Sequence, residues 1–347
     1  MVKFVEYKKL ITFSNQLLIK SGLDKFSAKC VSSSLCETSL RGVDSHGIKL
    51  LPAYVEFALK GRKNGKPKFK FNNPFPSFGV LDADNGFGLA AGLKAIDLGI
   101  KIAKKNGVSI ISVKNSSHPG ALASMTLKAA RSGYAAFAFT HADSLMLSHN
   151  STESFFGTNP ISFACPRSDS EPFCVDMATT MISWNKLLNA RVGNKKLLDN
   201  LASNISGKST TNPFLAKSLF PIGSYKGFAL ASMVEVLCGI MTGMPYGKKI
   251  PPMFTYPSNK KRPLGQFYII LRVDAILTKK QFKNRMKEFS NLVRKQKPLK
   301  GKKVQMPNDP EIDCSLKRLK EGIPISKSLF NDIYELGRKN KLKLINK

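Results

Sequence analysis

The chain has 347 residues and a formal net charge of +32, from 55 Lys and Arg against 23 Asp and Glu. With 42% hydrophobic residues and 23 Phe, it has ample material for a folded core, which excludes global disorder. No stretch of roughly 18 or more residues is apolar and free of charge, so no membrane span is expected.

The predicted elements change in character along the chain. Apolar residues at three- and four-residue spacing predict helices at 6–20, 25–40 and 50–59, followed by a polar, Pro-rich link at 62–76. Beyond this link, short apolar runs alternate with helical patterns, which is typical of an α/β fold. Strands are expected at 78–81, 108–113, 134–140, 161–165, 173–176 and 266–273. Further helices are expected at 89–105, 121–131, 225–241, 280–295 and 327–341, the last after a Lys-rich connector at 295–307.

The high positive charge raises the question of a nucleic-acid partner, because Lys and Arg supply most non-specific affinity for phosphates. The basic runs Lys60-Gly61-Arg62-Lys63 and Lys260-Lys261-Arg262 are short, and no nucleic-acid-binding motif accompanies them. We interpret these runs as ordinary solvated surface and expect no specific nucleic-acid partner.

Cysteine and histidine placement bears on compartment and metals. None of the six Cys forms a C-x-x-C pair, and the four His lie far from any paired Cys, so no metal site is expected. The N-terminus has lysines where a signal peptide needs an apolar run. We therefore expect reduced thiols and a cytoplasmic protein.

The run Gly86-Phe87-Gly88-Leu89-Ala90-Ala91-Gly92 resembles a dinucleotide-binding fingerprint at first sight. Its third glycine is one residue late for G-x-G-x-x-G, and the next strand ends in Val113-Lys114 where the fingerprint needs an acid. Glycines for a tight turn and close helix packing are the better interpretation.

Four short motifs place chemically useful side chains in turns. Ser45-His46-Gly47 offers an imidazole that exchanges protons near neutral pH, although a lone His is more often structural. His118 follows a strand and precedes a helix, where α/β proteins place ligands, or it belongs to a polar capping turn. Gly157-Thr158-Asn159-Pro160 is either a site loop or an ordinary turn. The fourth motif pairs Asp176-Met177-Ala178-Thr179 with Tyr225-Lys226-Gly227, which puts a lysine in the first turn of an apolar helix.

Taken in order, these motifs resemble the malate/L-lactate dehydrogenase family, which includes sulfolactate, ureidoglycolate and diketogulonate oxidoreductases. The similarity covers nearly the whole chain, from about residue 5 to 340. The matching runs are S-H-G at 45–47 with L-P-x-Y at 51–54, N-G-F-G at 85–88, N-S-S-H at 115–118, G-T-N-P at 157–160, D-M-A-T at 176–179 and Y-K-G at 225–227.

The resemblance implies a three-layer α/β fold that binds NAD or NADP without a Rossmann fingerprint. It implies an N-terminal helical domain (1–72), an NAD(P)-binding domain (73–300) and a C-terminal segment (301–347) packing back on the helical domain. A homodimer and a small 2-hydroxy or 2-oxo acid substrate are implied as well.

The same resemblance assigns roles to matched residues. His46 would exchange the proton at the substrate C–O with help from Ser45, and His118 is a second candidate for that role. Thr158 would contact substrate or cofactor, with Lys49 as a possible substrate contact. The residues implied for the cofactor are Ser117, His118, Gly120, Asp176, Met177, Ala178, Lys226 and Gly227.

Departures from the family pattern leave an alternative open. Leu50 stands where the family has an arginine that would clamp the substrate carboxylate, and Lys49 is turned about 100° aside on a helix. His141, Ser224 and Asn308 replace an asparagine and two glycines. The alternative is a catalytically weak relative that binds cofactor with altered substrate recognition.

Overall fold

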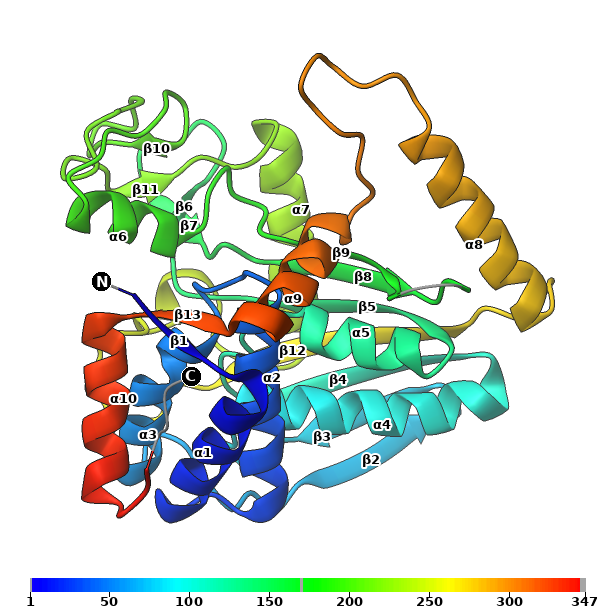
Figure 1. Ribbon diagram of the computed structural model, residues 1–347, viewed down its shortest axis with the longest axis horizontal. Helices are drawn as coiled ribbons and strands as arrows, with labels where there is room; N and C mark the ends of the chain where they lie inside the picture. Colours follow the sequence, from blue (N-terminus) through cyan, green and yellow to red (C-terminus); the bar gives the residue numbers. More distant parts are fainter. Residues whose placement is uncertain (1, 169–170, 344–347) are drawn as a thin grey trace.

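The computed structural model describes residues 2–168 and 171–343, and its largest sheet among them has seven strands (Figure 1). The strands lie in the order β2, β3, β4, β12, β5, β8 and β9, with bounds Lys70–Phe75, Phe78–Asp82, Val108–Ser116, Leu264–Arg272, Tyr134–Thr140, Ile161–Cys165 and Phe173–Met177. β3 and β4 run parallel, and the other neighbouring strands run antiparallel.

Both faces of this sheet are covered, which makes the three-layer α/β arrangement expected from the sequence. α4 (Gly88–Asn106) and α5 (Ala123–Arg131) pack on one face, while α7 (Tyr225–Glu235) and the π-turn η2 (Val236–Ile240) pack on the other. Side chains alternate along β12, so Tyr268 and Ile270 join the core under α4, and Phe267 joins Val234 and Cys238 under α7.

The helical layer brings both ends of the described chain together. α1 (Tyr7–Lys20), α2 (Lys25–Leu40), the short 3-10 turn η1 (Ile48–Leu50) and α3 (Leu51–Leu59) precede the sheet. β1 (Val2–Val5) pairs antiparallel with β13 (Ile323–Ser326), and α10 (Lys327–Lys339) packs against α1 and α3. One hydrophobic cluster continues from these helices into the sheet. The three-domain division stays a prediction.

A smaller sheet and the helices α6, α8 and α9 complete the described chain (Figure 1). The small sheet contains β10 (Ala202–Ser203), β11 (Ser218–Leu219), β6 (Met146–Leu147) and β7 (Ser154–Phe156), beside α6 (Trp184–Val192). α9 (Asp309–Glu321) packs on α2, and the 3-10 turn η3 spans Gly247–Lys249. α8 (Lys279–Arg294) stands out from the body at the upper right of the figure, with Ser290 as its buried residue.

The structure confirms the longer predicted elements to within a few residues. The 62–76 link is wrong in part, because β2 occupies 70–75: every residue of this edge strand is exposed, so no alternation marks it. α9 was also not predicted, since its few buried contacts leave a mostly polar sequence. In the described ranges, no helix combines the length and apolarity that crossing a bilayer requires.

Candidate active site

A cavity of about 480 Å³ opens where loops from the helical layer meet loops at one end of the sheet. Its wall combines the α2–η1 loop, the loop after β4, the ends of β5 and β9, and the segment before β12. The polar and charged side chains in that wall include Ser45, His46, His118, Asp143, Thr158, Asp176, Ser183, Asn185, Thr255 and Arg262.

His46 enters this wall from the turn between α2 and η1. The turn is tight because Gly47 packs on Ser39, where a Cβ would collide with the Ser39 hydroxyl, and Ser39 Oγ accepts from Ile48 N at 2.8 Å. Ser45 Oγ lies 2.9 Å from His46 Nδ1, which fixes the ring orientation. Burial lowers the pKa of His46 below its ordinary value, so the imidazole is neutral at pH 7.

His118 faces His46 across the same wall. Their ring centroids are 5.6 Å apart with an interplanar angle of 27°. His118 Nδ1 receives the backbone N–H of Gly120 at 3.3 Å and lies 3.1 Å from the Tyr54 hydroxyl. Because an amide N–H can only donate, Nδ1 is unprotonated and the ring carries its proton on Nε2. Burial, together with His46 and the nearby cations Arg262 and Lys63, holds the pKa of His118 well below its ordinary value.

Ser117 and the glycine run anchor the loop that carries His118. Gly88 N donates to Ser117 Oγ at 2.8 Å, and that hydroxyl donates to the Gly86 carbonyl at 3.1 Å. A Cβ at Gly88 would collide with the Ser117 carbonyl. The glycines therefore serve close packing, as interpreted from the sequence.

Arg262 brings a positive charge to the part of the wall near His118. Its side chain is buried, with Nη2 bonded to Asp143 Oδ1 at 2.5 Å and Nε bonded to the Pro251 carbonyl at 2.5 Å. A buried charge needs such partners, and here the carboxylate both balances and orients the guanidinium.

The loop that carries Thr158 is held by a buried polar network. Asn159, with φ of 30°, donates through Nδ2 to Glu235 Oε2 at 2.7 Å and to the Ala231 carbonyl at 3.0 Å. Glu235 Oε1 accepts from Gly247 N at 2.8 Å and lies 3.5 Å from His141 Nδ1. His141 Nε2 in turn accepts from Gly265 N at 2.9 Å. His141 thus acts as a structural link between α7 and the sheet.

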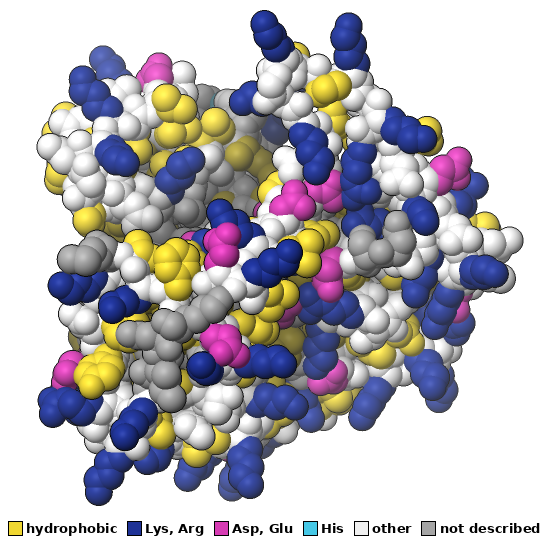
Figure 2. Space-filling model, viewed as in Figure 1, with side chains coloured by type: hydrophobic (Ala, Val, Ile, Leu, Met, Phe, Trp, Pro, Cys, Tyr) yellow, Lys and Arg dark blue, Asp and Glu magenta, His cyan; other side chains and the backbone are white. Residues whose placement is uncertain are grey.

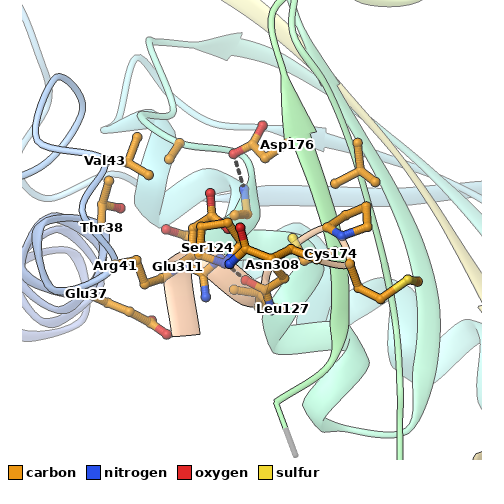
Figure 3. Close-up of a pocket in the computed structure, with 17 residues that line it drawn as sticks. Glu37, Thr38, Arg41, Val43, Ser124, Leu127, Cys174, Asp176, Asn308 and Glu311 are labelled. Carbon is orange, nitrogen blue, oxygen red and sulfur yellow. Dashed lines mark hydrogen bonds between the residues drawn. The ribbon is translucent and has the colours of Figure 1, made fainter. Parts of the chain in front are cut away.

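A second cavity of about 440 Å³ adjoins the first, and the two share Val43, Ala121 and Asp176 (Figure 3). The dashed line in Figure 3 marks Ala123 N donating to Asp176 Oδ2 at 2.8 Å, at the start of α5. The surrounding protein raises the pKa of Asp176 to about 6. On the other side, Arg41 at the end of α2 donates to Asn308 Oδ1 at 2.6 Å.

Comparison with known proteins now settles the family. The model of the malate/L-lactate dehydrogenase family matches residues 5–334. Ureidoglycolate dehydrogenase (NAD(+)) of Escherichia coli (strain K12) is 30% identical over 328 residues, covering 92% of this chain and 94% of that protein. A malate dehydrogenase of Pyrococcus abyssi is 31% identical over 341 residues, covering 95% and 93%. The crystal structure of malate dehydrogenase from Entamoeba histolytica matches with a TM-score of 0.94 and 26% identity over 99% of both chains.

The chain belongs to the malate/L-lactate dehydrogenase family. It is therefore an oxidoreductase of a family whose named relatives depend on NAD(+) or NADP(+), which confirms the expected enzyme class and cofactor.

The structure gathers most of the residues that the family resemblance singled out. The main cavity is lined by Ser45, His46, His118, Gly120, Thr158, Asp176, Met177 and Ala178. Ser117 lies just behind this wall, in a smaller cavity that also borders His118.

Three other expected residues line neither the main cavity nor the smaller one. Lys49 is exposed and donates to Asn189 Oδ1 at 3.3 Å. Lys226 is exposed in the first turn of α7, and Gly227 is buried there, where a Cβ would meet the Ile222 backbone. Leu50, at the family's arginine position, is 5% exposed and packs in the core.

Sequence reasoning assigned no role to three side chains at this site. Tyr54 bonds His118, and its L-P-x-Y motif was a usable signal. Asp143 and Arg262 had no such motif. Arg262 was interpreted as solvated surface, which is wrong: it is 3% exposed, because its charge is matched inside the protein by Asp143 from a distant part of the chain.

Proposed function

We propose that this enzyme interconverts a small 2-hydroxy acid and the corresponding 2-oxo acid with NAD or NADP. The observation that carries the proposal is one cavity wall that combines two neutral imidazoles with a buried, carboxylate-oriented guanidinium. Such a wall serves the two needs of the reaction, which are proton exchange at the C–O group and recognition of the neighbouring carboxylate.

His46 is the residue proposed to exchange the proton. With Nδ1–H donating to Ser45 Oγ, Nε2 is free to take the hydroxyl proton during oxidation and to return it during reduction. His118 is held in the opposite tautomer by Gly120 N–H, so its Nε2–H donates a hydrogen bond to the same oxygen. Tyr54 keeps that ring in place from α3.

Arg262 is the residue proposed to bind the substrate carboxylate. Leu50 cannot do so, because it is buried in the core away from the cavity wall. Asp143 fixes one edge of the guanidinium, and bidentate pairing with a carboxylate is the strongest contact an arginine makes. Thr158, whose backbone carbonyl accepts from Thr179 N at 2.9 Å, adds a hydroxyl to the same wall.

The two adjoining cavities fit an elongated dinucleotide. When bound, the cofactor supplies or accepts the hydride. Ser117, His118 and Gly120 would hold its nicotinamide end, and Asp176, Met177 and Ala178 would line the passage into the second cavity. Asp176 offers acceptor oxygens to hydroxyl groups at the point that both cavities share. Lys226 and Gly227 stay predictions from the family resemblance.

The test is consumption of NADH and NADPH with a panel of 2-oxo acids, beside the matching 2-oxo amides and neutral ketones. We expect turnover with at least one acid and at least tenfold less with its amide, because Arg262 needs an anion. Cofactor binding without turnover of any acid would contradict the proposal and favour the cofactor-binding relative.

We also propose the homodimer expected from the resemblance. Apolar side chains of α7 and the residues after it stay exposed to 37–58%: Leu230, Met233, Val236, Ile240 and Met241. Several exposed apolar side chains on one short segment are typical of a protein interface. Met233→Glu should shift the sedimentation coefficient from that of a dimer to that of a monomer, and an unchanged dimer would contradict this interface.

We also propose a cytoplasmic location, which the six free thiols support.

A further inference from the structure

A small inner cavity of about 20 Å³ lies next to the main one and is lined by cations. His118, Met253 and Arg262 border both cavities, so the inner one is reached from the substrate side. Arg62 and Lys63 complete its charged wall, with Tyr54, Phe57 and Phe87 around them. By volume, it has room for about one water-sized species.

Arg62 is buried with part of its hydrogen-bonding capacity unused. Its side chain is 1% exposed, and Nη1 donates to the Met253 carbonyl at 2.8 Å. Nε and Nη2 have no hydrogen-bond partner among the described residues. The Phe57 ring, 4.4 Å from the guanidinium carbon, covers one flat face of the group but offers nothing to its N–H edges.

Lys63 adds a second cation with little compensation. It is 7% exposed, and Nζ donates to the Arg262 backbone carbonyl at 3.3 Å. Burial, with Arg262 and Arg62 beside it, lowers the pKa of Lys63 to about 7. The nearby carboxylates are Asp143, which is bonded to Arg262, and Glu56, which is bonded to Lys60 on the surface. Buried charges are normally paired, so this group of three cations, with one bonded carboxylate, has an excess of positive charge.

We propose that Arg62, Lys63 and Arg262 form an inner anion-binding subsite that takes a halide ion or the tip of a carboxylate. The anion would accept from Arg62 Nε and Nη2 and would neutralise part of the field on His118. Two sources of the anion are chemically equivalent here: a free ion from solution and a second acidic group on the substrate.

The first test uses bromide as the probe and needs no turnover. Crystals of the full chain soaked in bromide should show an anomalous peak within hydrogen-bonding distance of Arg62 Nε and Nη2. Bromide should also raise the melting temperature of the wild type and of an Arg338→Met control, at an exposed position of α10, but not of Arg62→Met. If Arg62→Met folds poorly, Lys63→Met should weaken bromide binding by about tenfold. No peak, with equal bromide effects on wild type and Arg62→Met, would overturn the subsite.

The second test identifies the source and rests on the proposed function. If a second acidic group of the substrate occupies the subsite, bromide competes with oxaloacetate but not with pyruvate. Arg62→Met then raises KM for oxaloacetate about tenfold and raises KM for pyruvate, which has no second acidic group, by a much smaller factor. If a free ion occupies the subsite, bromide competes with neither acid. Competition with oxaloacetate alone and competition with neither acid would each support the subsite. Because bromide binding is measured without turnover, an inactive wild type would contradict the proposed function alone.

Discussion

The main and inner cavities both border His118, yet they treat charge in opposite ways. In the main cavity, Arg262 is matched by Asp143 and both histidines are neutral. In the inner cavity, Arg62 and Lys63 are buried with no matching carboxylate of their own in the described chain. If the proposed function holds, charge is balanced in the cavity where a proton moves and is left positive in the cavity where an anion binds.

The rest of the surface gives a third case. Figure 2 shows Lys and Arg side chains spread over the visible face rather than gathered in one patch. Exposed lysines such as Lys280 on α8 and Lys101 and Lys105 on α4 are solvated, so their charges need no buried counterion. Burial, and not the presence of a basic run, therefore distinguishes Arg62, Lys63 and Arg262 from the many other cations.

The largest effect on activity is expected from replacing His46, the residue proposed to exchange the proton in the main cavity. His46→Gln keeps a side chain of similar size but removes the group that titrates, so kcat/KM should fall roughly 1000-fold while the cofactor Kd changes little. Steady-state kinetics and cofactor fluorescence titration measure the two quantities. A loss below about tenfold would remove His46 from proton exchange.

Replacing Arg262, the cation that Asp143 balances, should have the next largest effect on activity. Arg262→Met removes the proposed carboxylate contact, and KM for the 2-oxo acid should rise roughly 10- to 100-fold. Arg262→Lys should restore only part of this, because an ammonium cannot pair bidentately. Arg272→Met, at an exposed ion pair, is the control. Equal KM values in Arg262→Met and the control would contradict the assignment.

The unbalanced cation should reveal itself in the pH dependence of stability. Because the pKa of Lys63 is about 7 in the folded chain and about 10.4 when unfolded, the unfolded state binds more protons between these values. Burial of the charged Lys63 ammonium therefore lowers the free energy of unfolding most below pH 7, and this loss disappears as the pH rises toward 10. In halide-free urea unfolding, Lys63→Met should gain most stability at pH 6 and least at pH 10. The exposed Lys66→Met is the control, and a pH-independent difference would disprove the shift.

The smallest effect concerns a position that lines neither cavity. Ser224 precedes α7 with φ of 57° and ψ of −121°, a backbone region that glycine alone adopts readily. Ser224→Gly should therefore raise the free energy of unfolding by about 1 kcal/mol, and chemical denaturation measures this. A destabilised Ser224→Gly would show that the serine side chain makes a compensating contact.

The main cavity was largely predictable from sequence because its residues sit in recognisable motifs. Ser45-His46-Gly47, His118, Thr158 and Asp176 each follow or precede a predicted element, and the fold brings these loops together. The glycine positions in the family pattern were informative too: Asn308 has φ of 82°, which asparagine tolerates, and its side chain bonds Arg41.

The inner cavity was not predictable, for a physical reason. Arg62 and Arg262 are 200 residues apart in sequence, and a basic side chain carries no local sign of burial. In the structure, an isolated β-bridge between Asn64 and Gly86 draws the 62–64 segment into the core. Lys49 shows the converse case, since its proximity to His46 in sequence does not place it in the cavity wall.

The pH dependence of kcat/KM for oxidation of the 2-hydroxy acid tests directly whether His46 takes the proton from the substrate hydroxyl. With its pKa below about 6.5, a neutral His46 acting as base gives a rate that rises with pH up to that region and is level at neutral pH. We predict that His46→Gln abolishes this rise and that His118→Gln, although slower, retains it. A rise that survives in His46→Gln and disappears in His118→Gln would contradict it.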